Sequence, residues 1–170
     1  GGNTYIDYIG TNNATSVSVP TPAAGRVNGA QQFNGTANKI TAPRIAAYDF
    51  TAGSSFTFEA WIKHPTSAIT VLEQIIGRKN TTDQLSVWLG FDNSKEITFS
   101  VRSKTGELFV ISGPDLLDNN WHHVVAVKDG ALNQLRLYVD GNLSSTIAAT
   151  FSSGFDSPTA IMSIGYRDIS

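Results

Sequence analysis

The side chains best suited to chemistry in this sequence are aromatic and cationic residues at alternate positions of apolar segments. They are Trp61, Trp88, Arg102, Arg136 and Tyr138. Flat aromatic rings suit the apolar face of a sugar, and guanidinium groups donate paired hydrogen bonds to carboxylate or sulfate oxygens. Gathered on one sheet face, the five residues would form a glycan-binding platform. Such residues also pair across strands simply to stabilise a sheet, so both interpretations stay open at this stage.

The carboxylates do not show the pairing that glycoside hydrolysis needs. A retaining hydrolase holds a nucleophile and an acid about 5 Å apart across one glycosidic bond. The four Glu residues are Glu59, Glu73, Glu96 and Glu107, and none has an Asp or Glu two positions away. Adjacent His122 and His123 point to opposite faces of a strand, so they cannot hold one metal ion together. We therefore expect no enzymatic activity, with an unusual hydrolase that uses Glu59 as a minor alternative.

Composition excludes several other classes of protein. Lys and Arg number 12 against 14 Asp and Glu, so no basic excess exists to bind nucleic acid. No apolar run approaches the ~18 residues of a membrane span, and no Cys is present for disulfides or thiolate chemistry. Charged residues make up only 15% of the 170 residues, which favours a secreted or cell-surface location.

The elements that must position these side chains alternate with period two. Phe56, Phe58, Ala60 and Ile62 share one face of residues 56–63, and Trp61 takes the other. Similar runs cover 85–92, 96–102, 108–112, 121–128, 134–140, 143–150 and 160–165. Turn residues between them indicate antiparallel pairing. We predict one all-β domain over residues 1–170, with at most two short strands in 1–35, a strand or turn at 70–76 and a helical turn at 114–118.

Several segments together resemble one family. They are 25–35, 56–62, 120–126, 135–141 and Ile164-Gly165. In this order and spacing they are similar to the laminin-G-like branch of the concanavalin-A-like lectin/glucanase superfamily. The resemblance implies an antiparallel jelly-roll sandwich of two sheets, one of them concave and carrying the platform. It also implies a non-catalytic recognition module of a larger secreted or surface protein, whose partner is a glycan. The alternative is a structural or adhesive module that binds a cell-surface protein.

The resemblance carries two further implications. Some members hold a structural calcium ion, for which Asp7, Asn12 and Asn34 would be the ligands here, although the same residue types commonly cap turns. Members also usually begin one strand earlier and end with one strand more. This chain is therefore expected to be part of a larger protein, or else to accept a donor strand from another chain.

Overall fold

The computed structural model describes residues 3–67, 69, 71–80, 82 and 84–166, and its strands form antiparallel sheets. The larger sheet has the order β1 (Thr4–Tyr5), β2 (Ala14–Thr15), β5 (Ile40–Ala42), β14 (Ile161–Ile164), β7 (Glu73–Lys79), β8 (Ser86–Phe91), β9 (Glu96–Arg102) and β10 (Leu108–Asp115). The second sheet has the order β13 (Asn142–Ala148), β12 (Gln134–Val139), β11 (Trp121–Asp129) and β6 (Phe56–Lys63). Within this described part of the chain, a hairpin of β3 (Thr21–Ala24) and β4 (Gly29–Gln32) pairs only with itself, and one short 3-10 helix, η1, spans Ala46–Tyr48. The predicted all-β antiparallel sandwich is confirmed.

The core lies between the eight-stranded and the four-stranded sheet, as the alternation predicts. Phe56 and Phe58 of β6 meet Phe99 of β9 with ring centroids 6.5 and 6.3 Å apart and their planes nearly perpendicular. Leu85, Leu89, Val124 and Ala126 are fully buried in the same cluster. Each large apolar side chain buried here contributes roughly 1.5–3 kcal/mol to stability, so these contacts hold the two layers together.

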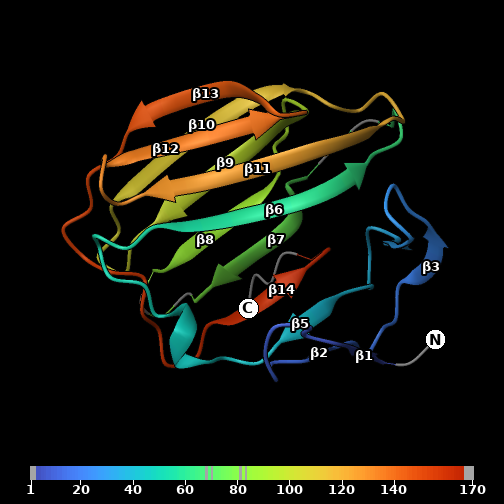
Figure 1. Cartoon of the computed structure of the whole chain (residues 1–170), viewed down its shortest axis with the longest axis horizontal. Helices are drawn as coiled ribbons and strands as arrows, with labels where there is room; N and C mark the ends of the chain where they lie inside the picture. Colours follow the sequence, from blue (N-terminus) through green and yellow to red (C-terminus); the bar gives the residue numbers. More distant parts are fainter. Residues whose placement is uncertain (1–2, 68, 70, 81, 83, 167–170) are drawn as a thin grey trace.

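The two layers do not overlap along their whole width. Figure 1 shows the four-stranded sheet above the β8–β10 part of the larger sheet, while β14, β5, β2 and β1 extend beyond the β6 edge. On the opposite side β10 contacts both β12 and β13, which closes the sandwich there. Within the described residues β6 pairs with β11 alone, so its other edge carries backbone groups without a strand partner.

Two local predictions were wrong, and one short element was not predicted. The first 35 residues hold four short strands, β1 to β4, rather than at most two, because two- to four-residue strands are too short to show alternation. Residues 114–118 form no helical turn: β10 continues to Asp115, whose carboxylate then accepts the backbone N–H of Leu117 at 2.8 Å. The η1 helix had no counterpart in the prediction. In the ambiguous 70–76 segment a strand forms, β7, although Thr70 lies outside the described residues.

Candidate functional site

Three of the five predicted platform residues share the outer face of the four-stranded sheet. Trp61 on β6 lies opposite His123 on β11. Tyr138 on β12 lies opposite Val125, and Arg136 lies opposite Val127 one row further along. Because inward and outward side chains alternate in a strand, and Leu135 and Leu137 are fully buried, Arg136 and Tyr138 point away from the core.

Trp88 and Arg102 correct the prediction that all five residues lie on one concave sheet. They belong to β8 and β9 of the eight-stranded sheet, on its outer face, so the sandwich separates them from Trp61. Trp88 is also only 8% exposed. Its Cβ would be 2.7 Å from a Cβ built on Gly77, which means that it packs closely against the neighbouring strand β7. The structure therefore places Trp61, Arg136 and Tyr138 on one sheet face, on β6 and β12, but not the whole set.

Trp61 is the centre of a cluster that we call the Trp61 surface: Arg26, Glu59, Trp61, Lys63 and His123. The indole is 41% exposed. The His123 ring lies 5.1 Å from it between centroids, tilted by 32°, and His123 Nε2 lies 2.9 Å from Glu59 Oε1. The guanidinium carbon of Arg26 lies 5.4 Å from the indole centroid, a cation–π distance.

Sequence reasoning missed Arg26 and His123 as members of this surface. His123 has a visible signal, since it faces outward on a predicted strand, but its register against Trp61 depends on strand pairing. Arg26 has none, because it lies in the turn between β3 and β4, 35 positions from Trp61 in the sequence. Gly25 N donates to Asn28 O at 3.1 Å, and Asn28 adopts a positive φ of 56°, so the turn that presents Arg26 is fixed locally.

The Arg136 guanidinium is engaged by two neighbouring side chains. Its Nη2 donates to Asp129 Oδ2 at 2.7 Å, and its Nε donates to Gln134 Oε1 at 3.2 Å. Asp129 also caps the following turn by accepting the N–H of Leu132 at 2.9 Å. The Arg136 side chain therefore anchors the β11–β12 turn.

A second histidine fixes the end of the strand that carries His123. His122 Nδ1 lies 2.8 Å from Asp140 Oδ2, and its Nε2 lies 3.1 Å from Asp118 Oδ1. Burial lowers the pKa of His122, but the hydrogen bonds to the two carboxylates outweigh it and leave the pKa raised. Asp140 also accepts the backbone N–H of His123 at 2.9 Å, so this cluster positions the rim of the Trp61 surface.

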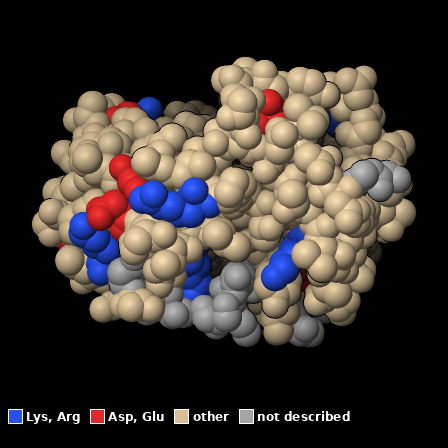
Figure 2. All heavy atoms as spheres, turned by 90° about the horizontal axis from the view of Figure 1, so that it is seen from below, with Lys and Arg blue, Asp and Glu red and all other residues tan. Residues whose placement is uncertain are grey.

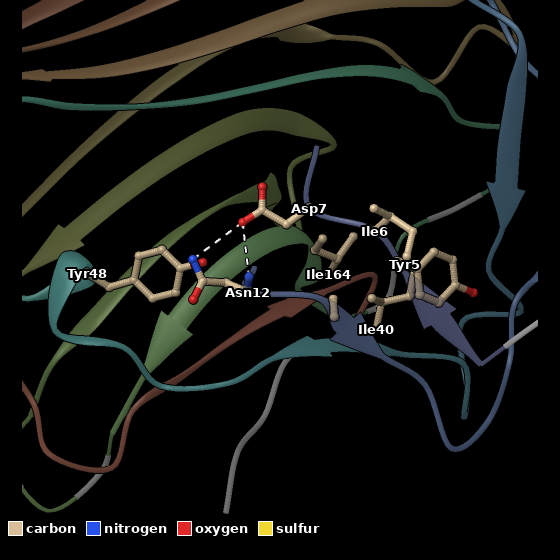
Figure 3. A pocket seen from close by; sticks show the side chains of 8 residues that line it. Tyr5, Ile6, Asp7, Asn12, Ile40, Tyr48 and Ile164 are labelled. Atoms are coloured by element: carbon tan, nitrogen blue, oxygen red, sulfur yellow. Dashed lines mark hydrogen bonds between the residues drawn. The ribbon is translucent and has the colours of Figure 1, made fainter. Parts of the chain in front are cut away.

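The predicted calcium ligands occupy turns. Figure 3 shows Asn12 donating from its backbone and its amide to Asp7 Oδ2, at 3.2 and 3.4 Å. Asp7 Oδ1 accepts the N–H groups of Gly10 and Ile9, and these backbone hydrogen bonds, Gly10 first, lower the pKa of Asp7. Asn34 Oδ1 accepts three backbone N–H groups of its own turn, from Thr36, Ala37 and Asn38.

The carboxylate oxygens of Asp7 and Oδ1 of Asn34 thus already accept hydrogen bonds from backbone donors, as turn-capping side chains do. No group of three or more His, Asp or Glu side chains gathers as a metal site among the residues that the structure describes. Calcium binding at Asp7, Asn12 and Asn34 stays an untested prediction.

A shallow hollow of about 330 Å³ adjoins the Asp7 turn, beyond the β6 edge. It is lined mainly by apolar side chains of β1, β5, β14 and η1, among them Tyr5, Ile40, Tyr48 and Ile164 (Figure 3). Figure 2 shows the molecule from this lower side, where most of the surface is uncharged and the Lys and Arg side chains lie in a few separate groups. Among the described residues no helix is long and apolar enough to cross a membrane.

Comparison with known proteins supports the fold. The family model described as the concanavalin A-like lectin/glucanases superfamily, of laminin G type, matches residues 34–168. No curated protein sequence matches the chain.

Three solved structures illustrate the similarity. The binding domain of Paraclostridial Mosquitocidal Protein 1 aligns with a TM-score of 0.76 and 15% identity over 94% of this chain, which spans 42% of that one. Domain 4 of AbnA, a GH43 extracellular arabinanase from Geobacillus stearothermophilus solved with arabinotriose, has a TM-score of 0.63 and 15% identity over 94% of this chain and 76% of its own. The ligand binding domain of Botulinum neurotoxin serotype D, solved with N-acetylneuraminic acid, has a TM-score of 0.61 and 14% identity over 96% of this chain and 36% of its own. Identities this low show a shared fold.

Proposed function

The chain belongs to the concanavalin A-like lectin/glucanases superfamily, and from this premise we propose that it is a non-catalytic module that binds carbohydrate through the Trp61 surface. The observation that carries the proposal is an indole 41% exposed on an outer sheet face, surrounded by hydrogen-bonding side chains. An exposed ring gives a pyranose its apolar contact, and the neighbouring polar groups orient the sugar hydroxyls.

The solved relatives support this proposal. Two of them were determined with a sugar bound, arabinotriose in one and N-acetylneuraminic acid in the other. The arabinanase is extracellular, in keeping with a secreted or cell-surface location for this chain. We place the module within a larger protein, because these relatives are named as single domains of larger proteins.

We propose a non-catalytic role because the Glu59 and Glu107 carboxylates are engaged in contacts within the protein. Glu59 of the Trp61 surface is paired with His123, and Glu107 accepts hydrogen bonds from the 152–153 loop. Neither has an Asp or Glu two positions away in the sequence, as paired carboxylates on one strand face would require. Incubation with oligosaccharides should therefore release no reducing ends, and hydrolysis abolished by Glu59→Gln would overturn this part of the proposal.

Substitution of the indole tests the binding role. Trp61→Ala should weaken binding to any glycan that the chain recognises on an array by at least about tenfold, measured by isothermal titration calorimetry. Leu108→Ala is the matched control, since Leu108 is similarly exposed, at 46%, on the opposite sheet. If Trp61→Ala bound the glycan as tightly as the parent, the binding site would not be the Trp61 surface.

A second candidate function is a protein-interaction module that accepts a strand. The observation that favours it is the open edge of β6, together with the apolar hollow of Tyr5, Ile40, Tyr48 and Ile164 beyond that edge. A strand from another polypeptide would pair with β6 and place alternate apolar side chains in the hollow. This candidate predicts that the partner protects β6 backbone amides from hydrogen exchange, whereas a glycan on the Trp61 surface contacts side chains.

A further inference from the structure

The charge around Trp61 is unbalanced. The carboxylate of the Trp61 surface, Glu59, is engaged by His123. Arg26 and Lys63 are both exposed, and within the described part of the chain neither forms an ion pair. Lys63 lies two positions after Trp61 on β6, so the two side chains share a face.

Three other arginines differ from Arg26 in being paired with a carboxylate. Arg136 is paired with Asp129, while Arg44 and Arg78 share Asp49. The chain as a whole has a net charge of -2, so a site with spare positive charge is not a consequence of a basic composition. Arg26 and Lys63 thus place two positive charges that have no ion pair within the described residues on the surface around the exposed indole.

We infer that the ligand of the Trp61 surface is an acidic sugar, whose carboxylate or sulfate binds the guanidinium of Arg26 while its ring stacks on Trp61. This inference rests on the proposed function and names the class of glycan. A guanidinium binds either oxyanion with two parallel N–H···O bonds, whereas a neutral sugar offers only single hydroxyl contacts. Lys63 adds a second positive charge on the same face of β6.

The position of Arg26 explains how the Trp61 indole and the Arg26 guanidinium would bind the same sugar. Its guanidinium carbon lies 5.4 Å from the indole centroid, within the space that a stacked sugar would occupy. Arg26 is exposed in the β3–β4 turn, so its side chain can leave the ring without disturbing the core. A neutral sugar would have to displace this cation–π contact without compensation, but an acidic sugar replaces it with an ion pair.

The experiment is calorimetric titration of the chain with acidic oligosaccharides, each paired with its neutralised form. Carboxylated oligosaccharides are compared with their carboxyl-reduced counterparts, and sulfated oligosaccharides with their desulfated counterparts. At least one acidic form should bind at least about tenfold more tightly than its neutral counterpart, and the pair that shows the difference identifies the oxyanion. Arg26→Met should abolish that preference, and added salt should weaken acidic binding selectively.

Lys95→Met is the control, because it removes the same unit of charge from the β8–β9 turn of the other sheet. Equal binding of acidic and neutral forms, or an unchanged preference in Arg26→Met, would overturn the inference while leaving carbohydrate binding at Trp61 intact. Arg26 would then serve only to pin the β3–β4 hairpin against the sheet. Binding to no oligosaccharide at all would overturn the inference together with the proposed function.

Discussion

At the scale of single residues, the polar side chains of this molecule mostly hold loops to the sheets. Glu107 accepts the backbone N–H and the hydroxyl of Ser152 at 2.9 and 2.6 Å, and the hydroxyl of Ser103 at 2.9 Å. These bonds, those from Ser152 first, lower the pKa of Glu107 to about 2 from its usual 4.5. The charged carboxylate therefore joins the start of β10 to the 152–153 loop.

This pKa has a consequence for stability in acid. The unfolded chain takes up a proton at Glu107 near pH 4.5, whereas the folded chain does so only near pH 2. The contribution of Glu107 is thus complete above pH 4.5 and is lost as the pH falls toward 2. Thermal melts across this range should show Glu107→Gln less stable than the parent at pH 7, with a smaller loss on acidification. Parallel curves for the two proteins would contradict the prediction.

Arg78 is a buried charged side chain that, like Glu107, joins a strand to neighbouring loops. Its guanidinium donates to the carbonyls of Tyr48 at 2.6 Å and Phe155 at 2.7 Å, and to Asp49 Oδ1 at 2.8 Å. Arg78→Met should lower the free energy of unfolding by about 3–5 kcal/mol, because Asp49 and the carbonyls lose a buried charged partner. Urea denaturation measures it, and Arg102→Met, on a partly exposed side chain, should stay within about 0.5 kcal/mol of the parent. If Arg78→Met lost as little free energy of unfolding as Arg102→Met is expected to lose, the hydrogen-bond network around Arg78 would be unimportant for stability.

At the scale of elements, the alternation of apolar residues predicted which segments form strands and which side chains share a strand face. It did not predict which strands pair with each other. Trp61 and Trp88 carry the same signal, an aromatic residue at an outward position of an apolar strand. The pairing of β6 with β11, and of β8 with β7 and β9, sends them to opposite sides of the molecule. Pairing depends on contacts between residues far apart in the sequence, which a local pattern does not contain. The same limit hid Arg26, whose place over Trp61 depends on how the β3–β4 hairpin folds back.

The contact between β7 and β8 gives an element-scale prediction. A Cβ on Gly90 of β8 would lie 2.1 Å from the backbone oxygen of Glu73, beside the register shift between Gln74 and Ile76. Gly90→Ala must therefore move one strand and should cost about 1–3 kcal/mol in the free energy of unfolding. Gly53→Ala is the matched control, since a Cβ there meets nothing within 4 Å. A Gly90→Ala variant as stable as Gly53→Ala would mean that the two strands separate without cost.

At the scale of the whole molecule, the unequal width of the two layers governs where the fold is open. The strands β8, β9, β11 and β12 each have a neighbour on both sides. In contrast, among the described residues β6 has one neighbour and β3 and β4 pair only with each other, while β1 and β2 are two residues long. Backbone amides bonded between two strands exchange with solvent only through larger openings of the structure. Protection should therefore decrease from the centre of each sheet to these edges.

Hydrogen exchange measured by NMR on the isolated chain tests this gradient. The slowest amides should lie in β9 and β11, where the fully buried Phe99 and Val124 also fix the core. In β6, amides that point to β11 should be protected, and those that point to the open edge should exchange at rates close to those of the β3–β4 hairpin. If every β6 amide were instead as slow as those of β11, the edge would already be closed by a second copy of the chain. Protection that falls on dilution would then identify self-association, and the strand-accepting function would gain its first partner.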